Sequence, residues 1–142
     1  MKDLQQFEKI LDTEYRIISM ETYDVDRIHE MFTRLSRFTP RPIYEWEPGV
    51  GMRRLGASHI VIPRTQTARD VLMHIEKSAH YAVYVMRNFN EAMQDAATAE
   101  TLRRIATSDV ARTIVLLSEA VNLPESLKPL TLRSRHQLRQ AS

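Results

Sequence analysis

The sequence predicts an α/β fold, a three-layer sandwich in which helices cover both faces of a five-stranded, mainly parallel sheet. The first observation is that short extended segments alternate with segments whose apolar residues recur at helical spacing. The second is the continuous apolar run TIVLL at 113–117, which is typical of a central strand covered on both faces. The third is size, because 142 residues with 43% hydrophobic content are enough for one domain with one core.

Four segments have the apolar spacing of helices, and most have a recognisable start or stop signal. We expect Asp24 and Thr67 to be N-caps and Thr98 to open a helix, because such side chains accept hydrogen bonds from the free N–H groups of a first turn. Pro40 and Pro42 end the second helix, since proline cannot continue one. The expected helices cover 3–11, 24–38, 67–79 and 98–106.

The remaining apolar segments are expected to be extended. All three glycines of the chain fall within 48–58, which we interpret as a flexible surface loop after the second strand. We expect one α/β domain over 1–132 and a basic polar tail over 133–142. The extended segments are 15–20, 43–46, 59–62, 82–86, 113–117 and 130–132.

Composition excludes several classes of protein. Cysteine is absent, so disulfides, thiolate metal sites and cysteine nucleophiles are excluded. The chain has no apolar run of about 18 residues, and its first residues are too polar for a signal peptide. We therefore expect a soluble, cytoplasmic protein.

The glycine segment comes close to a phosphate-binding motif. Residues 51–58 follow the pattern G-x-x-x-x-G-A-S, in which alanine replaces the lysine that would contact the β- and γ-phosphates. A P-loop also has to follow the first core strand and open a helix, whereas this segment follows the second strand and leads into an extended piece. The position after the first strand holds Glu21, Tyr23 and Asp24, and the two acids there repel phosphate. We predict no Walker A motif and no nucleotide cofactor.

Metal and catalytic groups are also missing from the expected places. An acid for Mg²⁺ should end the strand at 82–86, but the chain has Arg87 and Asn88 there. The sequence HEMFT at 29–33 begins like a zinc motif but lacks its second histidine. No G-x-S-x-G elbow surrounds any serine. We expect no catalytic residues, no metal and no enzymatic activity.

Protein recognition is the function we favour from the sequence. The carboxyl ends of parallel strands are where ligands sit, which directs attention to the glycine segment and to the segment from Ser118 to Ser126. Arg53 and Arg54 could there clamp a carboxylate or phosphate of a partner. The candidate partner-binding residues are Gly49, Gly51, Met52, Arg53, Arg54, Gly56, Ser118 and Asn122.

Nucleic-acid binding is an alternative from a different class. The net charge is only +2, but four of the 20 Lys and Arg residues follow Glu125, the last acid. A second basic excess lies between Arg34 and Arg69, where the acids are Glu45 and Glu47. The candidate residues for this alternative are Arg41, Arg64, Arg69, Arg133, Arg135 and Arg139.

Five segments, in their order and spacing, resemble a known family. They are YRIISMET at 15–22, PIYEW at 42–46, AVYVMRNFN at 82–90, LRRIA at 102–106 and TIVLLSEAVNLPESL at 113–127. Together they resemble the amino-terminal domain of bacterial and plastid AAA+ ATPases, the sporulation-ATPase-like class with a chloroplast open-reading-frame member. The resemblance spans about residues 4–132.

The resemblance implies a fold and a partner. It implies a degenerate P-loop NTPase core without Walker A, with strand order 5-1-4-3-2, preceding a working ATPase module that would be the partner in cis or in trans. The family pattern usually carries aspartate where this chain has Asn88. We expect a non-catalytic regulatory or adaptor domain, with a homodimer as a possible assembly.

A pseudo-receiver signalling domain is a second fold alternative. A receiver needs paired acids after its first strand, which Glu21 and Asp24 loosely provide, and Ser118 fits the end of its fourth strand. Its phosphorylatable aspartate is replaced by Arg87 and Asn88. Both folds lead to a non-catalytic module.

Overall fold

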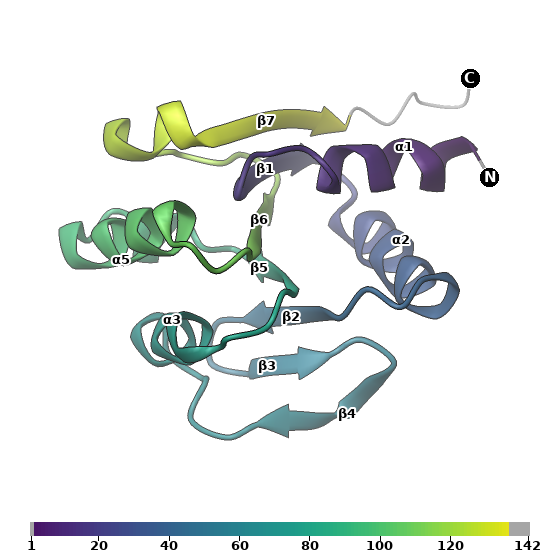
Figure 1. Cartoon of the computed structure of the whole chain (residues 1–142), viewed down its shortest axis with the longest axis horizontal. Coiled ribbons are helices and arrows are strands. Elements are labelled where there is room, and N and C mark those ends of the chain that lie inside the picture. Colours follow the sequence, from purple (N-terminus) through teal and green to yellow (C-terminus); the bar gives the residue numbers. More distant parts are fainter. Residues whose placement is uncertain (1, 137–142) are drawn as a thin grey trace.

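The computed structural model describes residues 2–136 and has three layers (Figure 1). One sheet forms the middle layer. Helices α1 (Lys2–Leu11) and α2 (Val25–Phe38) cover one face. Helices α3 (Ala68–Lys77) and α5 (Ala96–Thr107), with the short α4 (Asn90–Met93) and the 3-10 helix η1 (Glu125–Leu130), cover the other. The predicted α/β sandwich is confirmed.

The described sheet has seven strands rather than the five predicted, in the order β4-β3-β2-β5-β6-β1-β7. Strands β2, β5, β6, β1 and β7 are mutually parallel. Numbered along the chain, these five have the order 5-1-4-3-2 that the resemblance implied. A receiver has the order 2-1-3-4-5, so the pseudo-receiver alternative is wrong. The strands are β1 (Ile17–Thr22), β2 (Ile43–Glu47), β3 (Gly51–Arg54), β4 (Ala57–Ile62), β5 (Val83–Arg87), β6 (Thr113–Ser118) and β7 (Thr131–His136).

The two additional strands form a hairpin from the segment predicted to be a flexible loop. That prediction is wrong because β3 pairs antiparallel with both β2 and β4. Gly49 has φ 77° in a turn closed by a hydrogen bond from the Val50 N–H to the Glu47 carbonyl (3.2 Å). Gly51 has φ 109°, and a Cβ there would lie 2.9 Å from Val61 Cγ1. The glycine spacing thus serves a turn and close strand packing.

Thr65 fixes the hairpin to the loop before α3. Its buried hydroxyl accepts a hydrogen bond from the Met52 N–H (2.9 Å) and donates one to the Ile62 carbonyl (2.7 Å). Its carbonyl accepts the indole N–H of Trp46 (2.6 Å). These bonds join three strands to one loop, so the segment after β2 is an ordered part of the sheet.

The helix caps are confirmed at two of three positions. Asp24 accepts the Arg27 N–H and Thr67 accepts the Asp70 N–H. Helix α5 begins two residues before Thr98 because Asp95 is its N-cap, and Asp95 accepts the N–H of Thr98 itself. Asp95 is favoured over Thr98 as the N-cap because its carboxylate also complements the positive end of the helix dipole.

Buried side chains fill both gaps between sheet and helices. On the α1 and α2 face, Phe7 and Phe32 pack edge to face with ring centroids 4.5 Å apart. On the α3 and α5 face, Trp46 packs in the same manner against Phe89, with centroids 5.4 Å apart. The run 113–117 is buried throughout as the central strand β6, as its apolar pattern predicts.

At the carboxyl end of the chain, β7 extends further than predicted. It continues through Arg133 and Arg135, which pair with Ser19 and Glu21 of β1. The first residues of the predicted basic tail therefore belong to the sheet, and Arg139 lies outside the described residues. Within residues 2–136, no helix is long and apolar enough to cross a membrane.

Candidate functional site

The carboxyl ends of β1 and β6 form the place where this sheet would receive a ligand. The chain leaves β1 towards α2 on one face and leaves β6 towards η1 on the opposite face. Where adjacent parallel strands diverge in this way, a crevice opens that holds the ligand in many doubly wound proteins. We call the corresponding position in this topology the β1/β6 crevice; the residues there are Glu21 of β1 and the segment 118–122, which begins with the last residue of β6.

The chain's own side chains bridge that crevice. The Glu21 carboxylate accepts the backbone N–H of Val121 (2.8 Å), which ties the end of β1 to the loop after β6. Asn90 of α4 donates to the Ala120 carbonyl (2.6 Å) and accepts the Asn122 N–H (2.8 Å). Ser118 donates to the same Ala120 carbonyl (2.6 Å). The polar groups that could bind a ligand are thus used to hold the loop.

The amino end of α2, directly after β1, carries a carboxylate. Asp24 accepts the Arg27 N–H (3.1 Å), while its own N–H donates to the Thr22 hydroxyl (3.1 Å). In a P-loop protein, the N–H groups at the start of this helix would bind phosphate. Here a protein carboxylate takes one of those donors and adds negative charge, with Asp26 in the same turn.

A network of charged side chains lies beside this crevice, on the α2 face of the sheet. Its centre is Glu45 of β2, only 1% exposed, whose Oε2 lies 2.6 Å from His29 Nδ1. The other carboxylate oxygen lies 3.9 Å from an Arg53 nitrogen and 4.0 Å from an Arg87 nitrogen. That oxygen has no hydrogen-bond partner within the described structure, so the two arginines compensate its charge without bonding it.

Two further acids complete the network. Glu47 pairs with Arg53 (3.2 Å) and with Arg87 (3.4 Å), and Asp26 of α2 pairs with Arg87 (3.4 Å). Both arginines are therefore paired with acids of the same chain. Sequence reasoning missed this network; the signal was the alternation IYEWE in β2, which places Glu45 on the same face as the buried Ile43.

The predicted partner-binding residues are not brought together on one surface. Met52 is fully buried in the core, so it cannot contact a partner in the folded protein. Arg53 belongs to the charged network, and Arg54 lies over the ring of Tyr44 (5.9 Å) at the amino edge of the sheet. Gly49 and Gly51 lie near the carboxyl ends of the parallel strands, as do Ser118 and Asn122. Gly56 is in the turn between β3 and β4, near the amino ends of the parallel strands.

The residues of the nucleic-acid alternative are likewise dispersed. Arg133 is on the edge strand β7, Arg64 follows β4 at the other edge of the sheet, and Arg69 is in the first turn of α3. Arg41 lies at the start of β2, where it is bonded to Asp12 and Tyr81. The described residues of this set therefore form no continuous basic surface.

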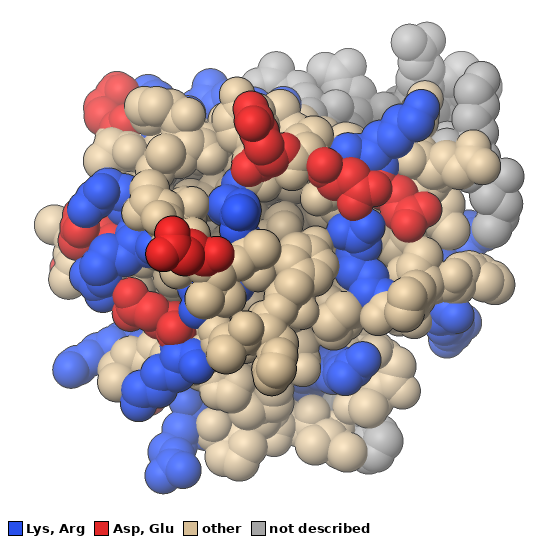
Figure 2. Space-filling model, viewed as in Figure 1, with Lys and Arg blue, Asp and Glu red and all other residues tan. Residues whose placement is uncertain are grey.

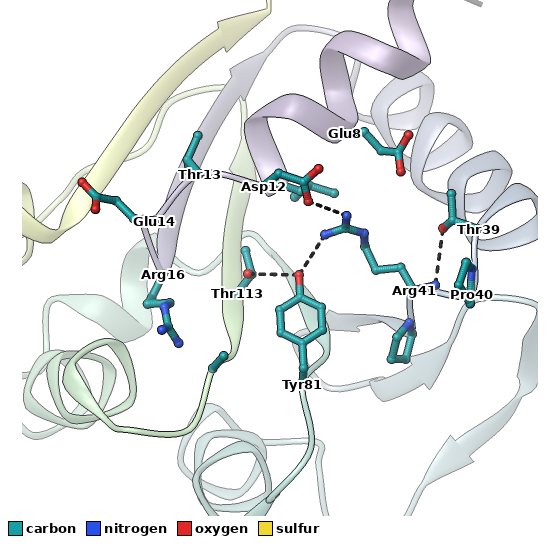
Figure 3. Close-up of a pocket in the computed structure, with 13 residues that line it drawn as sticks. Glu8, Asp12, Thr13, Glu14, Arg16, Thr39, Pro40, Arg41, Tyr81 and Thr113 are labelled. Carbon is teal, nitrogen blue, oxygen red and sulfur yellow. Dashed lines mark hydrogen bonds and ion pairs between the residues drawn. The ribbon is translucent and has the colours of Figure 1, made fainter.

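A cavity of about 630 Å³ surrounds Arg41 at the amino ends of the strands (Figure 3). Arg41 donates to Asp12 (2.6 Å) and to the Tyr81 hydroxyl (2.9 Å), which in turn lies 3.5 Å from the Thr113 hydroxyl. Burial alone would lower the pKa of Arg41, but its hydrogen bond to Asp12 and the charges around it raise that pKa above the usual value. Three acids line the cavity, Glu8, Asp12 and Glu14, with two bases, Arg16 and Arg41, and Arg41 is already paired with Asp12.

No group of three or more histidine, aspartate or glutamate side chains capable of holding a metal ion occurs among the described residues. The carboxylates of Glu45 and Glu47 lie instead beside the guanidinium groups of Arg53 and Arg87.

Comparison with known proteins identifies the family. The family model described as SpoVK-like AAA ATPase, N-terminal domain, matches residues 3–135. No curated protein and no solved structure matches the chain. The match covers nearly all of the α/β domain described above, and the chain therefore belongs to the family of SpoVK-like AAA ATPase N-terminal domains.

Proposed function

We propose that the domain is a non-catalytic, partner-binding module that works beside an AAA ATPase module. The observation that carries the proposal is that hydrogen bonds within the chain join the carboxyl ends of β1 and β6. Glu21 binds the Val121 N–H there, and Asp24 caps α2 with its own carboxylate. Both carboxylates stand where a nucleotide would need free N–H donors.

The charges at the neighbouring strand ends support the same proposal. Arg87, at the end of β5, forms ion pairs with Asp26 and Glu47, so its charge is already paired within the chain. Asn88, which follows it, adopts φ 54°, a left-handed conformation that asparagine tolerates well, and its N–H donates to the Leu117 carbonyl. Asn88 therefore joins β5 to β6, a structural use of a position where a nucleotide-hydrolysing site would need an acid.

A thermal experiment with nucleotide tests this proposal. We expect millimolar ATP with Mg²⁺ to leave the melting temperature of the domain unchanged relative to Mg²⁺ alone. Ligand at about 100 times its Kd would stabilise the folded state by about 2.7 kcal/mol, which raises the melting temperature by several degrees. A rise of that kind would overturn the proposal.

The partner-binding part has its own measurement. The domain is added to an AAA ATPase module of the same family, and the rate of ATP hydrolysis by that module is followed. We expect the rate to change with domain concentration and to saturate. A rate that stays constant, with no association in sedimentation, would contradict action on the ATPase module.

A further inference from the structure

We propose that the outer edge of β4, with the groove between β4 and α3, binds an extended segment of a partner protein that carries alternating apolar and acidic side chains. This inference rests on the proposed function, since it names the surface through which partner binding would occur. The sheet would gain one strand from the partner, and the groove would receive the partner's side chains.

The first observation is that β4 is an edge strand of the sheet. It pairs with β3 alone, so N–H and C=O groups along its other side are available to another strand. Its sequence, ASHIVI, contains neither proline nor a charged residue, two of the means that block such an edge, although its pairing with β3 has a register shift between Ala57 and Val61 and Pro63 follows its last residue. The opposite edge strand, β7, has Arg133 and Arg135 in its sequence.

The second observation is that β4 exposes apolar side chains. Ile60 is 58% exposed and Val61 is 38% exposed. Val61 pairs with Arg53 and lies on the α2 face, and Ile60 precedes it within the register shift of the β3–β4 pair. An added strand would cover both of these side chains, because strand neighbours on each face lie about 5 Å apart.

The third observation is a groove beside this edge. Its volume is about 640 Å³, and Ile62 at the end of β4 and the half-exposed Met73 of α3 provide apolar walls. The rest of its lining consists of Pro63, Arg64, His74, Lys77 and a single acid, Asp70.

The charges select the kind of partner. Arg64 and Lys77 have no ion-pair partner within the described part of the chain, unlike Arg53 and Arg87. In Figure 2, the lower part of the surface, over the region of β3 and β4, shows tan and blue atoms without red. An acidic segment would pair with these cations.

A second copy of the chain fits this surface less well. The β4 strand of a second copy, ASHIVI, contains no acid that could pair with Arg64 and Lys77. We therefore assign the edge to a segment of opposite charge.

A fluorescein-labelled synthetic peptide of alternating valine and glutamate is the probe. We expect saturable binding by fluorescence anisotropy, together with slower amide hydrogen exchange at residues 57–62. A peptide of alternating valine and lysine should bind at least about tenfold more weakly. The acidic peptide methylated at alternate backbone nitrogens should lose binding, because it lacks the donors for strand addition.

Charge-reversal variants distinguish peptide binding at this groove from nonspecific electrostatic attraction to the rest of the protein surface. The double variant Arg64→Glu with Lys77→Glu should weaken binding of the acidic peptide by about tenfold or more. Arg37→Glu, at an exposed position at the end of α2 on the other face of the sheet, is the matched control and should bind normally. Both variants change surface residues, and their unchanged melting temperatures would show that they fold.

Several results would overturn the proposal. The first is that the acidic peptide does not bind. The second is that it still binds after methylation of its backbone or after charge reversal of Arg64 and Lys77. The third is that the peptide slows amide hydrogen exchange outside β4 rather than within it. A dimer in sedimentation equilibrium that Ile60→Glu splits would instead assign the edge to a second copy. Single-stranded DNA that slows exchange at 57–62 would assign it to nucleic acid. If ATP leaves the melting temperature unchanged and the peptide fails, only the β4 inference falls; stabilisation by ATP would remove the proposed function itself.

Discussion

The carboxyl ends of β1 and β6 and the outer edge of β4 both leave backbone polar groups at a border of the sheet. At the first border, Glu21 and Asn90 bind the loop after β6, and Arg87 faces acids of its own chain. At the second, the backbone faces solvent, and Lys77 stands beside it with no ion-pair partner among residues 2–136. One border is satisfied internally, and the other is open to a partner.

This difference means that the charges at one border contribute to the stability of the fold, whereas those at the other contribute to partner binding. The charges near the carboxyl ends are partly buried, so their loss costs free energy of unfolding. The charges beside β4 are exposed, so their loss costs little stability and acts instead on binding. Substitutions at the two borders should therefore have opposite profiles in unfolding and binding experiments.

The largest effect on stability is expected for Glu45→Ala. Removal of this buried carboxylate leaves His29 without its partner. It also removes negative charge that offsets the positive charges of Arg53 and Arg87. We expect the free energy of unfolding to fall by about 3 kcal/mol, as when one partner of a buried ionic group is removed. Urea denaturation followed by circular dichroism measures it.

The control is Glu100→Ala, because Glu100 pairs with Arg103 on the exposed surface of α5. Its urea midpoint should remain close to that of the unaltered protein. Equal losses in the two variants would contradict the central place of Glu45 in the network.

An intermediate effect is expected for Asn90→Ala. This substitution removes the bonds to the Ala120 carbonyl and the Asn122 N–H, and each such bond contributes about 1 kcal/mol. We expect a loss of about 1–2 kcal/mol in the free energy of unfolding and faster amide exchange at Asn122. Glu91→Ala, an exposed change in the same short helix, is the control. Unchanged exchange at Asn122 would mean that Asn90 does not hold the loop.

Local features of the sequence predict the layers and much of the helix boundaries. Asp24 and Thr67 cap their helices as expected, because a cap depends on residues within one turn. The run 113–117 predicts the central strand for a similar reason. The strand order came from the family resemblance, since periodicity does not say which strands are neighbours.

The hairpin and the charged network depend on contacts that the sequence does not display. Gly51 is needed because Val61 and Thr65 approach its α-carbon, and both lie in elements that follow it in the chain. Glu45 and Arg87 are 42 positions apart and meet only through the register of β2 and β5. From the sequence, the glycine cluster is therefore predicted to be a loop, and no pairing is predicted for the acids in β2.

The smallest effect on stability is expected for Lys77→Ala, and it sharpens the comparison most directly. Lys77 is exposed in the last turn of α3, so its removal should change the free energy of unfolding by no more than about 0.5 kcal/mol. Arg87→Ala, the matched change at the carboxyl edge, should destabilise the domain clearly, because Arg87 faces Asp26 and Glu47 as well as the buried Glu45. The same two variants in the peptide assay should reverse this order, with weaker binding for Lys77→Ala and normal binding for Arg87→Ala at a temperature where it is folded. Similar unfolding losses for both would mean that Lys77 has a structural partner, and the contrast between the two borders would then fail.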